Sequence, residues 1–154
     1  MTPTDRLAAK GYQLPPVASS AANYVPFVGA HGMVTISGQL PFLDGKIFKT
    51  GQVGQSVTLE EAKVAAGHCA LNILAQLSAA ISGDWDRVER VVRLGGFVNS
   101  PSDFFEHHLV INGASDMMVT ALGERGRHAR AAVGVSALPL NAAVEVDALV
   151  ALRS

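Results

Sequence analysis

The chain has 154 residues, of which 49% are hydrophobic and only 16% are charged, and its formal net charge is −1. This length suits one domain with its own core, so we expect a single domain over residues 1–154 with an N-terminal extension over residues 1–19. The balanced charge provides no basic surface for a polyanion, so nucleic acid is not an expected partner. Because so little of the surface is charged, self-association is expected to cover part of the apolar surface.

The sequence also indicates the cellular compartment in which the protein is expected. Cys69 is the only cysteine, which excludes an internal disulfide and is typical of a reducing environment. The N-terminus lacks the apolar core of a signal peptide, and no stretch approaches the roughly eighteen apolar residues of a membrane span. We therefore expect a soluble cytoplasmic protein that does not bind a membrane.

The first third of the chain has the turn signals of a short helix and several strands. Glycine-containing turns at residues 29–32 and 44–46 favour tight connections between strands. We expect a helix over residues 5–10 and strands over residues 24–28, 33–40 and 47–49.

Two helices are predicted in the middle of the chain. Apolar residues recur at three- and four-residue steps over residues 59–80, and Thr58 with Glu61 forms a capping-box pattern. The second helix is expected to begin at Ser100-Pro101, with serine as N-cap and proline in the first turn, and to end near Gly123.

Three further strands complete the pattern. One is expected over residues 88–98, between the helices, and two over residues 129–138 and 143–152. This order predicts an α+β domain: a mixed sheet with both helices packed on one face. The other face would then be covered by something else, and a second copy of the chain is the simplest candidate.

The last two strands contain an isolated charged pair, Arg130 and Glu145. Side chains alternate between the two faces of a strand. Arg130 shares its face with small residues, and Glu145 lies opposite the branched face that contains Val144 and Val146. Both charges are therefore expected to point away from the helices, toward the uncovered face.

The spacing of this pair predicts that one subunit cannot bring the two charges together. If residues 139–142 close a simple hairpin, Arg130 and Glu145 are offset by about five residues, or roughly 17 Å. A neighbouring subunit is then the simplest way to bring them together. The alternative interpretation is that Arg130 belongs to a structural ion pair, which is a common role for arginine.

Several motifs together resemble one known family. They are Ala129-Arg130-Ala131, Leu138-Pro139, Val144-Glu145-Val146, the run Ile36-Ser37-Gly38-Gln39-Leu40-Pro41, Tyr24, residues 98–104 and Asn112. The sequence resembles the RidA (YjgF) family of imine deaminases, also called the L-PSP endoribonuclease family, over roughly residues 20–152.

The resemblance implies a chorismate-mutase-like fold, a homotrimer and ligand sites in clefts between subunits, with the uncovered sheet face at the interfaces. Arg130 would bind the carboxylate of a 2-imino or 2-enamino acid, and Glu145 would handle the attacking water and its proton. The substrate pocket would be completed by Tyr24, Ser37, Gly38, Asn112 and Ala132. The products would be a 2-oxo acid and ammonium. No cofactor is expected, because an imine carbon is already a good electrophile.

Three departures from the family pattern put the substrate in question. Ala132 stands where the family often has a cysteine or another small residue, and His128 replaces the proline or similar residue before the arginine motif. The N-terminal extension through Gln13 is also longer than in the short RidA proteins. A carboxylate-binding trimer without turnover therefore stays an alternative, and RNA cleavage is a third that the charge balance disfavours. No metal is expected, because the adjacent His107 and His108 would diverge by about 100° on a helix.

Overall fold

The computed structural model describes residues 1–17 and 23–154, so the last two residues of the predicted N-terminal extension lie outside the described residues. A five-stranded sheet has the order β1-β2-β7-β5-β6, and β3 and β4 form a separate hairpin. The strands are β1 (Phe27–Ala30), β2 (Met33–Gln39), β3 (Phe42–Leu43), β4 (Lys46–Ile47), β5 (Val88–Asn99), β6 (Ala129–Val135) and β7 (Val144–Leu152). The helices are α1 (Pro3–Ala8), α2 (Leu59–Ala80) and α3 (His107–Leu122), with 3-10 turns η1 (Trp85–Arg87), η2 (Gly123–Gly126) and η3 (Pro139–Asn141).

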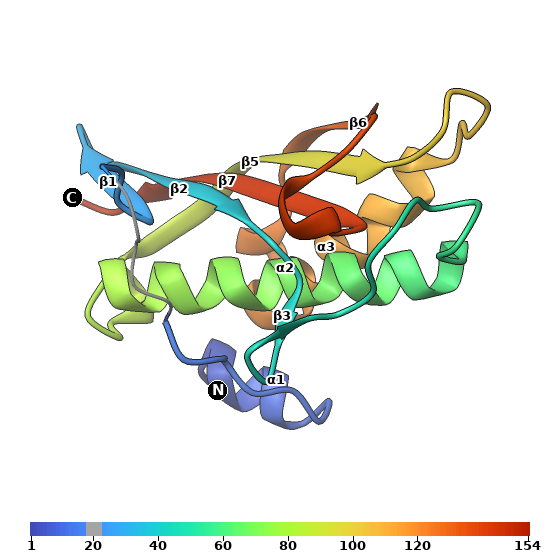
Figure 1. The fold of residues 1–154 in the computed structure, drawn as a ribbon. Helices are drawn as coiled ribbons and strands as arrows, with labels where there is room; N and C mark the ends of the chain where they lie inside the picture. Colours follow the sequence, from blue (N-terminus) through green and yellow to red (C-terminus); the bar gives the residue numbers. More distant parts are fainter. Residues whose placement is uncertain (18–22) are drawn as a thin grey trace.

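The two long helices pack against each other on one face of the sheet (Figure 1). Strand β5 pairs parallel with β6 and antiparallel with β7, so the sheet is mixed. These features confirm the predicted α+β class. The strand order differs from the prediction in one respect: β5 lies between β6 and β7, so the expected hairpin of the last two strands is wrong.

The connection after β6 explains why no hairpin forms. Leu140 and Asn141 both have positive φ angles, 57° and 56°, so the chain turns away from β6 at η3. The end of β5 then holds the incoming chain, because Asn99 donates its backbone N–H to Ala143 and its side-chain amide to Ala142. Strand β7 therefore starts next to β5.

In β7, the residues that face the helices are those that the sequence alternation predicted. In β6, the predicted helix-facing and outward-facing residues are exchanged. In β7, Val144 and Val146 are fully buried beneath the helices. In β6, Arg130 is paired with Leu94, which is fully buried on the helix face, so Arg130 points toward α3. A side chain at Gly134 would collide with His107 of α3. The small residues of β6 therefore mark the face over which α3 passes closely.

Helix α3 begins six residues later than Ser100-Pro101 predicted. The Ser100 hydroxyl donates to the carbonyl of Val98 and also contacts His107 Nε2 at 3.1 Å, so it is not available as an N-cap. Helix α2 spans the predicted residues, and Thr58 Oγ1 accepts the N–H of Glu61 as expected. Helix α1 starts two residues early because Thr2 caps it.

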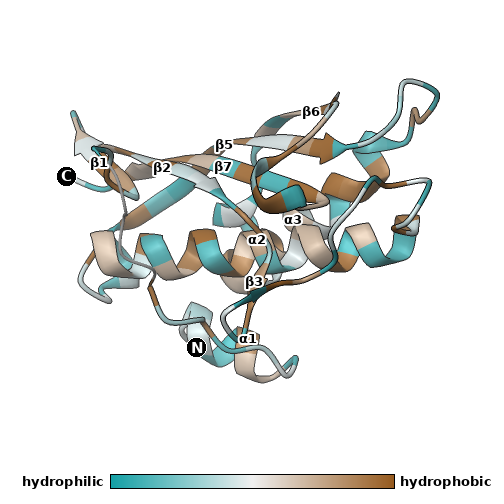
Figure 2. Cartoon of the chain, in the orientation of Figure 1, coloured by the Kyte–Doolittle hydropathy of each residue, from teal (hydrophilic) through white to brown (hydrophobic). Residues whose placement is uncertain are grey.

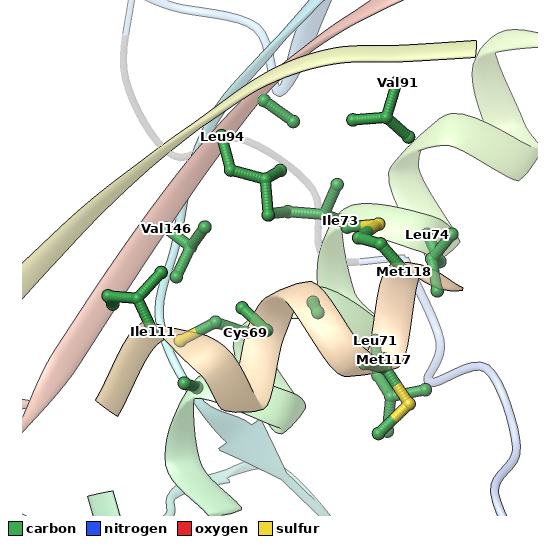
Figure 3. Packing of buried hydrophobic residues seen from close by; sticks show 14 of the residues in the cluster. Cys69, Leu71, Ile73, Leu74, Val91, Leu94, Ile111, Met117, Met118 and Val146 are labelled. Carbon is green, nitrogen blue, oxygen red and sulfur yellow. The ribbon is translucent and has the colours of Figure 1, made fainter. Parts of the chain in front are cut away.

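The core lies between the sheet and the two long helices. Figure 3 shows Cys69 of α2, Ile111 of α3 and Val146 of β7 in this core, where all three are fully buried. Burial raises the pKa of the Cys69 thiol well above its ordinary value, so this cysteine is a packing residue rather than a nucleophile. None of the helices in residues 1–17 and 23–154 is long and apolar enough to cross a membrane.

The opposite face of the sheet carries apolar residues that no helix of the described chain covers (Figure 1). Val28 and Val133 are 56% and 46% exposed, and Phe97 lies beside Val133 on the same face. In Figure 2, β5 changes from hydrophilic at its start to hydrophobic toward its end. A face with this composition favours burial against another protein surface.

Candidate active site

Glu145 lies near the start of β7 and points to the open face of the sheet. The residue is half-buried and lines a cleft of about 1050 Å³. Burial raises the pKa of the Glu145 carboxyl, and the negative charge of Asp147 raises it further. No ion pair is formed by Glu145 within the described residues. A carboxyl with a raised pKa in a cleft is suited to accept and return a proton.

Gly38 allows the Glu145 carboxylate to approach β2. The pairing of β2 with β7 slips by one residue between Ile36 and Gln39, which bulges the strand at this point. A Cβ at position 38 would overlap Glu145 Oε1 and lie 2.9 Å from Glu145 Cδ. A side chain at position 38 would thus displace the Glu145 carboxylate, and Gly38 forms the cleft wall directly against it.

Ser37 holds the segment that carries Tyr24 rather than lining the cleft. Its hydroxyl donates to the Val25 carbonyl at 2.9 Å, and its N–H donates to the Pro26 carbonyl at 2.9 Å. Tyr24 lines the cleft and is 59% exposed. It precedes β1, which starts at Phe27 rather than at residue 24 as predicted, because Pro26 has no N–H to donate to a ladder.

Arg130 lies on β6 under α3, where two neutral acceptors hold its guanidinium. Nη1 donates to Ser115 Oγ and Nη2 donates to the His108 carbonyl, each at 3.0 Å. Within the described residues Arg130 has no carboxylate partner, so the structural ion pair considered above is not formed inside the subunit. Its positive charge is oriented but not neutralised, as an anion-binding arginine requires.

A short relay of hydrogen bonds orients Arg130. His128 Nδ1 lies 2.6 Å from the Gly126 carbonyl, and Nε2 lies 2.8 Å from Ser115 Oγ. Because a carbonyl can only accept, Nδ1 must carry the proton, and Nε2 of the neutral ring accepts from Ser115. The Ser115 oxygen is thereby left to accept from Arg130. Burial lowers the pKa of His128, which keeps the ring neutral, and the Arg130 charge lowers that pKa further.

The other two predicted pocket residues flank Arg130. Ala132 is on the same side of β6 and packs against the core. Asn112 is half-buried on α3, four residues after His108 and three before Ser115, so it lies on the same stripe of the helix. Sequence reasoning missed Ser115 and the His108 carbonyl. Their seven-residue spacing, two helical turns, was the available signal.

The two halves of the site are separated within one chain. In the strand register, Arg130 of β6 pairs with Leu94 of β5. Glu145 of β7 and Val133 of β6 both pair with Phe97 of β5. The Arg130 and Glu145 Cα atoms are thus roughly 14 Å apart, three residues along and two strands across. Their side chains also leave opposite faces of the sheet. Arg130 lines its own open depression of about 650 Å³ with Ser115 and His128.

The histidines near α3 do not gather ligands for a metal. His107 contacts Ser100 and meets the edge of the Phe104 ring at 5.2 Å between centroids. Within residues 1–17 and 23–154, no group of three or more His, Cys, Asp or Glu side chains is arranged to hold a metal ion.

Comparison with known proteins identifies the family. A family model described as "YjgF/chorismate_mutase-like, putative endoribonuclease" matches residues 4–152. The chain belongs to this family. This match confirms the predicted family and its chorismate-mutase-like fold class.

Three relatives are similar over nearly the whole chain. Protein TCP17 of Trypanosoma cruzi is 51% identical over 145 residues, which are 94% of this chain and 90% of that protein. A crystal structure of a protein of unknown function from Agrobacterium tumefaciens is 51% identical, with a TM-score of 0.93 over 98% of this chain and 92% of that one. A "putative endoribonuclease" from Shewanella oneidensis is 36% identical, with a TM-score of 0.94 over 99% of this chain and 100% of that one.

Proposed function

We propose that this YjgF protein forms a trimer and hydrolyses 2-imino and 2-enamino acids to 2-oxo acids and ammonium in clefts between its subunits. One observation carries the proposal. Arg130 and Glu145 form no ion pair within the described residues and leave opposite faces of the sheet, so the arginine of one subunit can face the glutamate cleft of the next. The apolar open face and the family membership support the same assembly.

Arg130 would bind the substrate carboxylate. A guanidinium has five N–H donors in a planar fork, and the bonds to Ser115 and His108 use only two of them. The remaining donors suit a bidentate contact with a carboxylate, which fixes the orientation of the imine. Because the Ser115 hydroxyl and the His108 backbone carbonyl carry no charge, they orient the guanidinium without competing for its charge.

Glu145 would move the protons. Water adds to the carbon of the protonated imine while Glu145 accepts one proton of the water, which gives a neutral carbinolamine. Glu145 then returns that proton to the amine nitrogen, and the carbon–nitrogen bond breaks. As the hydroxyl oxygen becomes the carbonyl of the 2-oxo acid, Glu145 takes the hydroxyl proton and passes it to the departing ammonia, which leaves as ammonium. A raised pKa suits the first step, because a carboxylate with a higher pKa is a stronger base toward water, and the protonated carboxyl can then return the proton. The reaction is a hydrolysis and needs no oxidant or reductant.

A coupled assay tests this function. A pyridoxal-phosphate dehydratase releases 2-aminoacrylate from serine, and the loss of the imine is followed with and without the protein. We expect the protein to accelerate imine loss in proportion to its concentration. Binding of 2-oxo acids without acceleration would instead support the carboxylate-binding alternative. RNA cleavage is not favoured, since the net charge is −1 and the described residues that line the Glu145 cleft include two carboxylates and no lysine or arginine.

A further inference from the structure

The Glu145 cleft extends well beyond the carboxylate. Its outer part is bounded by residues 11–16, here called the N-terminal arm, by the β3–β4 hairpin and by one flank of α2. Figure 1 shows the N-terminal segment and β3 on the side of α2 that faces away from the sheet. The whole cleft, about 1050 Å³, matches sites for drug-sized ligands, which occupy roughly 300–1,000 Å³. A three-carbon imino acid would fill only a small part of it.

The N-terminal arm is a fixed wall. Leu7, just before it, is 1% exposed in the core, and α1 packs against α3. The Tyr12 N–H donates to the Leu7 carbonyl at 3.0 Å, and the Gly11 N–H donates to Ala8 at 2.9 Å. These contacts anchor the arm where it enters the cleft wall, so the outer part of the cleft is built into the fold.

A line of polar residues on α2 faces this outer part. His68, Asn72 and Gln76 are four residues apart and lie on one stripe of the helix, and all three line the cleft. Asn72 has a structural role, because its amide donates to the carbonyls of Phe42 and His68 at 3.0 and 2.9 Å. His68 packs against the Phe48 ring, and burial lowers its pKa, so it is held neutral.

Gln76 has no such structural explanation. Its side chain is only 3% exposed, and its Oε1 atom has no hydrogen-bond partner among the described residues. A buried amide oxygen without a partner destabilises a fold, and an apolar residue of similar size would avoid the penalty. A polar group that is retained in a cleft at this cost indicates a ligand group that pairs with it.

The composition of the cleft limits what that ligand is. Among the described residues that line it, Asp44 and Glu145 are the carboxylates and none is lysine or arginine, so an anionic tail would be repelled. Apolar walls such as Leu14, Pro15 and Leu71 suit a hydrocarbon or aromatic chain. We propose that the substrate is a 2-imino acid with a large uncharged side chain that ends in a hydrogen-bond donor, such as a phenol, indole or amide, which pairs with Gln76. This assignment rests on the proposed function, because Glu145 marks the reacting end.

The test uses 2-oxo acids, the stable products, as binding probes for the full-length protein. Pyruvate, phenylpyruvate and 4-hydroxyphenylpyruvate differ in size and then in one hydroxyl. We expect phenylpyruvate to bind at least about tenfold more tightly than pyruvate, and the hydroxyl to add about another tenfold, as one good hydrogen bond would. Gln76→Leu should remove the preference for the hydroxyl while pyruvate binding stays unchanged. Gln55→Leu, an exposed glutamine outside the cleft, is the matched control.

Two further measurements make the result decisive. The thermal midpoint of Gln76→Leu should equal or exceed that of wild type, because the Gln76 side chain makes no hydrogen bond to the described residues. A lower midpoint would overturn the assignment and show Gln76 to be structural. Imines of alanine, phenylalanine and tyrosine, generated by an L-amino-acid oxidase, should be hydrolysed with the same order of preference. Equal affinity for the three acids, or a hydroxyl preference that survives Gln76→Leu, would overturn the substrate assignment alone. The predicted order of binding without any turnover would overturn the deaminase proposal alone.

Discussion

The guanidinium of Arg130 and the carboxylate of Glu145 leave opposite faces of the same sheet, Arg130 under α3 and Glu145 on the open side. This relationship follows from the pairing of both β6 and β7 with β5. Arg130 lies beside the buried Leu94, whereas Glu145 lies beside the half-buried Phe97. In the proposed trimer, one subunit would therefore supply Arg130 to one cleft and Glu145 to another, and the two residues can be tested separately.

The assembly can be tested on the open face. We expect a particle of about three times the 16.1 kDa chain mass in light scattering. Val133→Glu should dissociate it, because Val133 is 46% exposed on the face that would be covered, and a buried unpaired carboxylate is costly. Val64→Glu, at a 51% exposed position on the outer side of α2, is the control and should leave the mass unchanged. A wild-type monomer at micromolar concentration would exclude the inter-subunit site.

Arg130→Ala should weaken the binding of a 2-oxo acid by about 10- to 100-fold, the usual range for a charged hydrogen bond, while the particle mass and thermal transition are retained. Arg130→Lys should recover little, because an ammonium cannot contact Ser115, the His108 carbonyl and a carboxylate in the same geometry. Calorimetric titration measures both. An alanine variant that fails to fold would show that Arg130 has a structural role.

Glu145→Gln should separate binding from chemistry. The amide keeps the shape of the carboxyl group but cannot take a proton from water. We therefore expect nearly normal affinity for a 2-oxo acid and a loss of about 10²- to 10⁴-fold in imine hydrolysis. Both quantities should be measured on the same preparation. Equal hydrolysis rates for the two proteins would exclude the catalytic role of Glu145.

Gly38→Ala tests the close approach of β2 to Glu145. The added methyl group would overlap the carboxylate and displace it, and a shift of about 1 Å can cost roughly 100-fold in rate. The matched control is Gly29→Ala in β1, where the nearest atom to an added Cβ is 3.8 Å away. We expect the control to retain activity and Gly38→Ala to lose most of it, with similar circular dichroism spectra. Full activity of Gly38→Ala would show that the position of the carboxylate is not critical.

His128 predicts a dependence on pH. Its folded-state pKa lies below the ordinary value of 6.5, so well above pH 6.5 the ring is neutral in both the folded and unfolded states. As the pH falls from 6.5 toward the lower folded pKa, the unfolded state binds the proton first and stability is lost. His128→Gln lacks this titration yet can still accept from Ser115. The difference in thermal midpoint between His128→Gln and wild type should therefore shift in favour of the variant when the pH is lowered from 7.5 to 5.

The His128→Gln variant also tests whether the hydrogen bonds from His128 through Ser115 control the orientation of Arg130. Protonated His128 would donate to Ser115 rather than accept from it, which disturbs the oxygen that holds Arg130. The affinity of wild type for a 2-oxo acid should fall below pH 6.5, and that of His128→Gln should change less. His68, whose pKa is also lowered by burial, titrates in both proteins and cancels in the comparison. Parallel pH profiles would show that the relay does not control Arg130.

Local patterns in the sequence were sufficient for most elements. The three- and four-residue apolar period and the Thr58 cap predicted α2 with its correct bounds. The start of α3 could not be predicted in this way, because Ser100 has the residue type of an N-cap but uses its hydroxyl on Val98 and His107. That competition involves groups that meet only after the chain folds.

The sequence by itself determined the α+β class, the placement of both helices on one face, the outward facing of Glu145, and the membership of Arg130 and Glu145 in one family motif. These features depend on periodicity and residue type, which are local. Only the tertiary structure decided that β5 separates β6 from β7 and that Arg130 points to α3. It also decided that residues 11–16 form part of the wall of the Glu145 cleft. Strand partners and helix approach depend on the packing of distant segments, and the alternation within one strand does not state which of its faces the helices will cover.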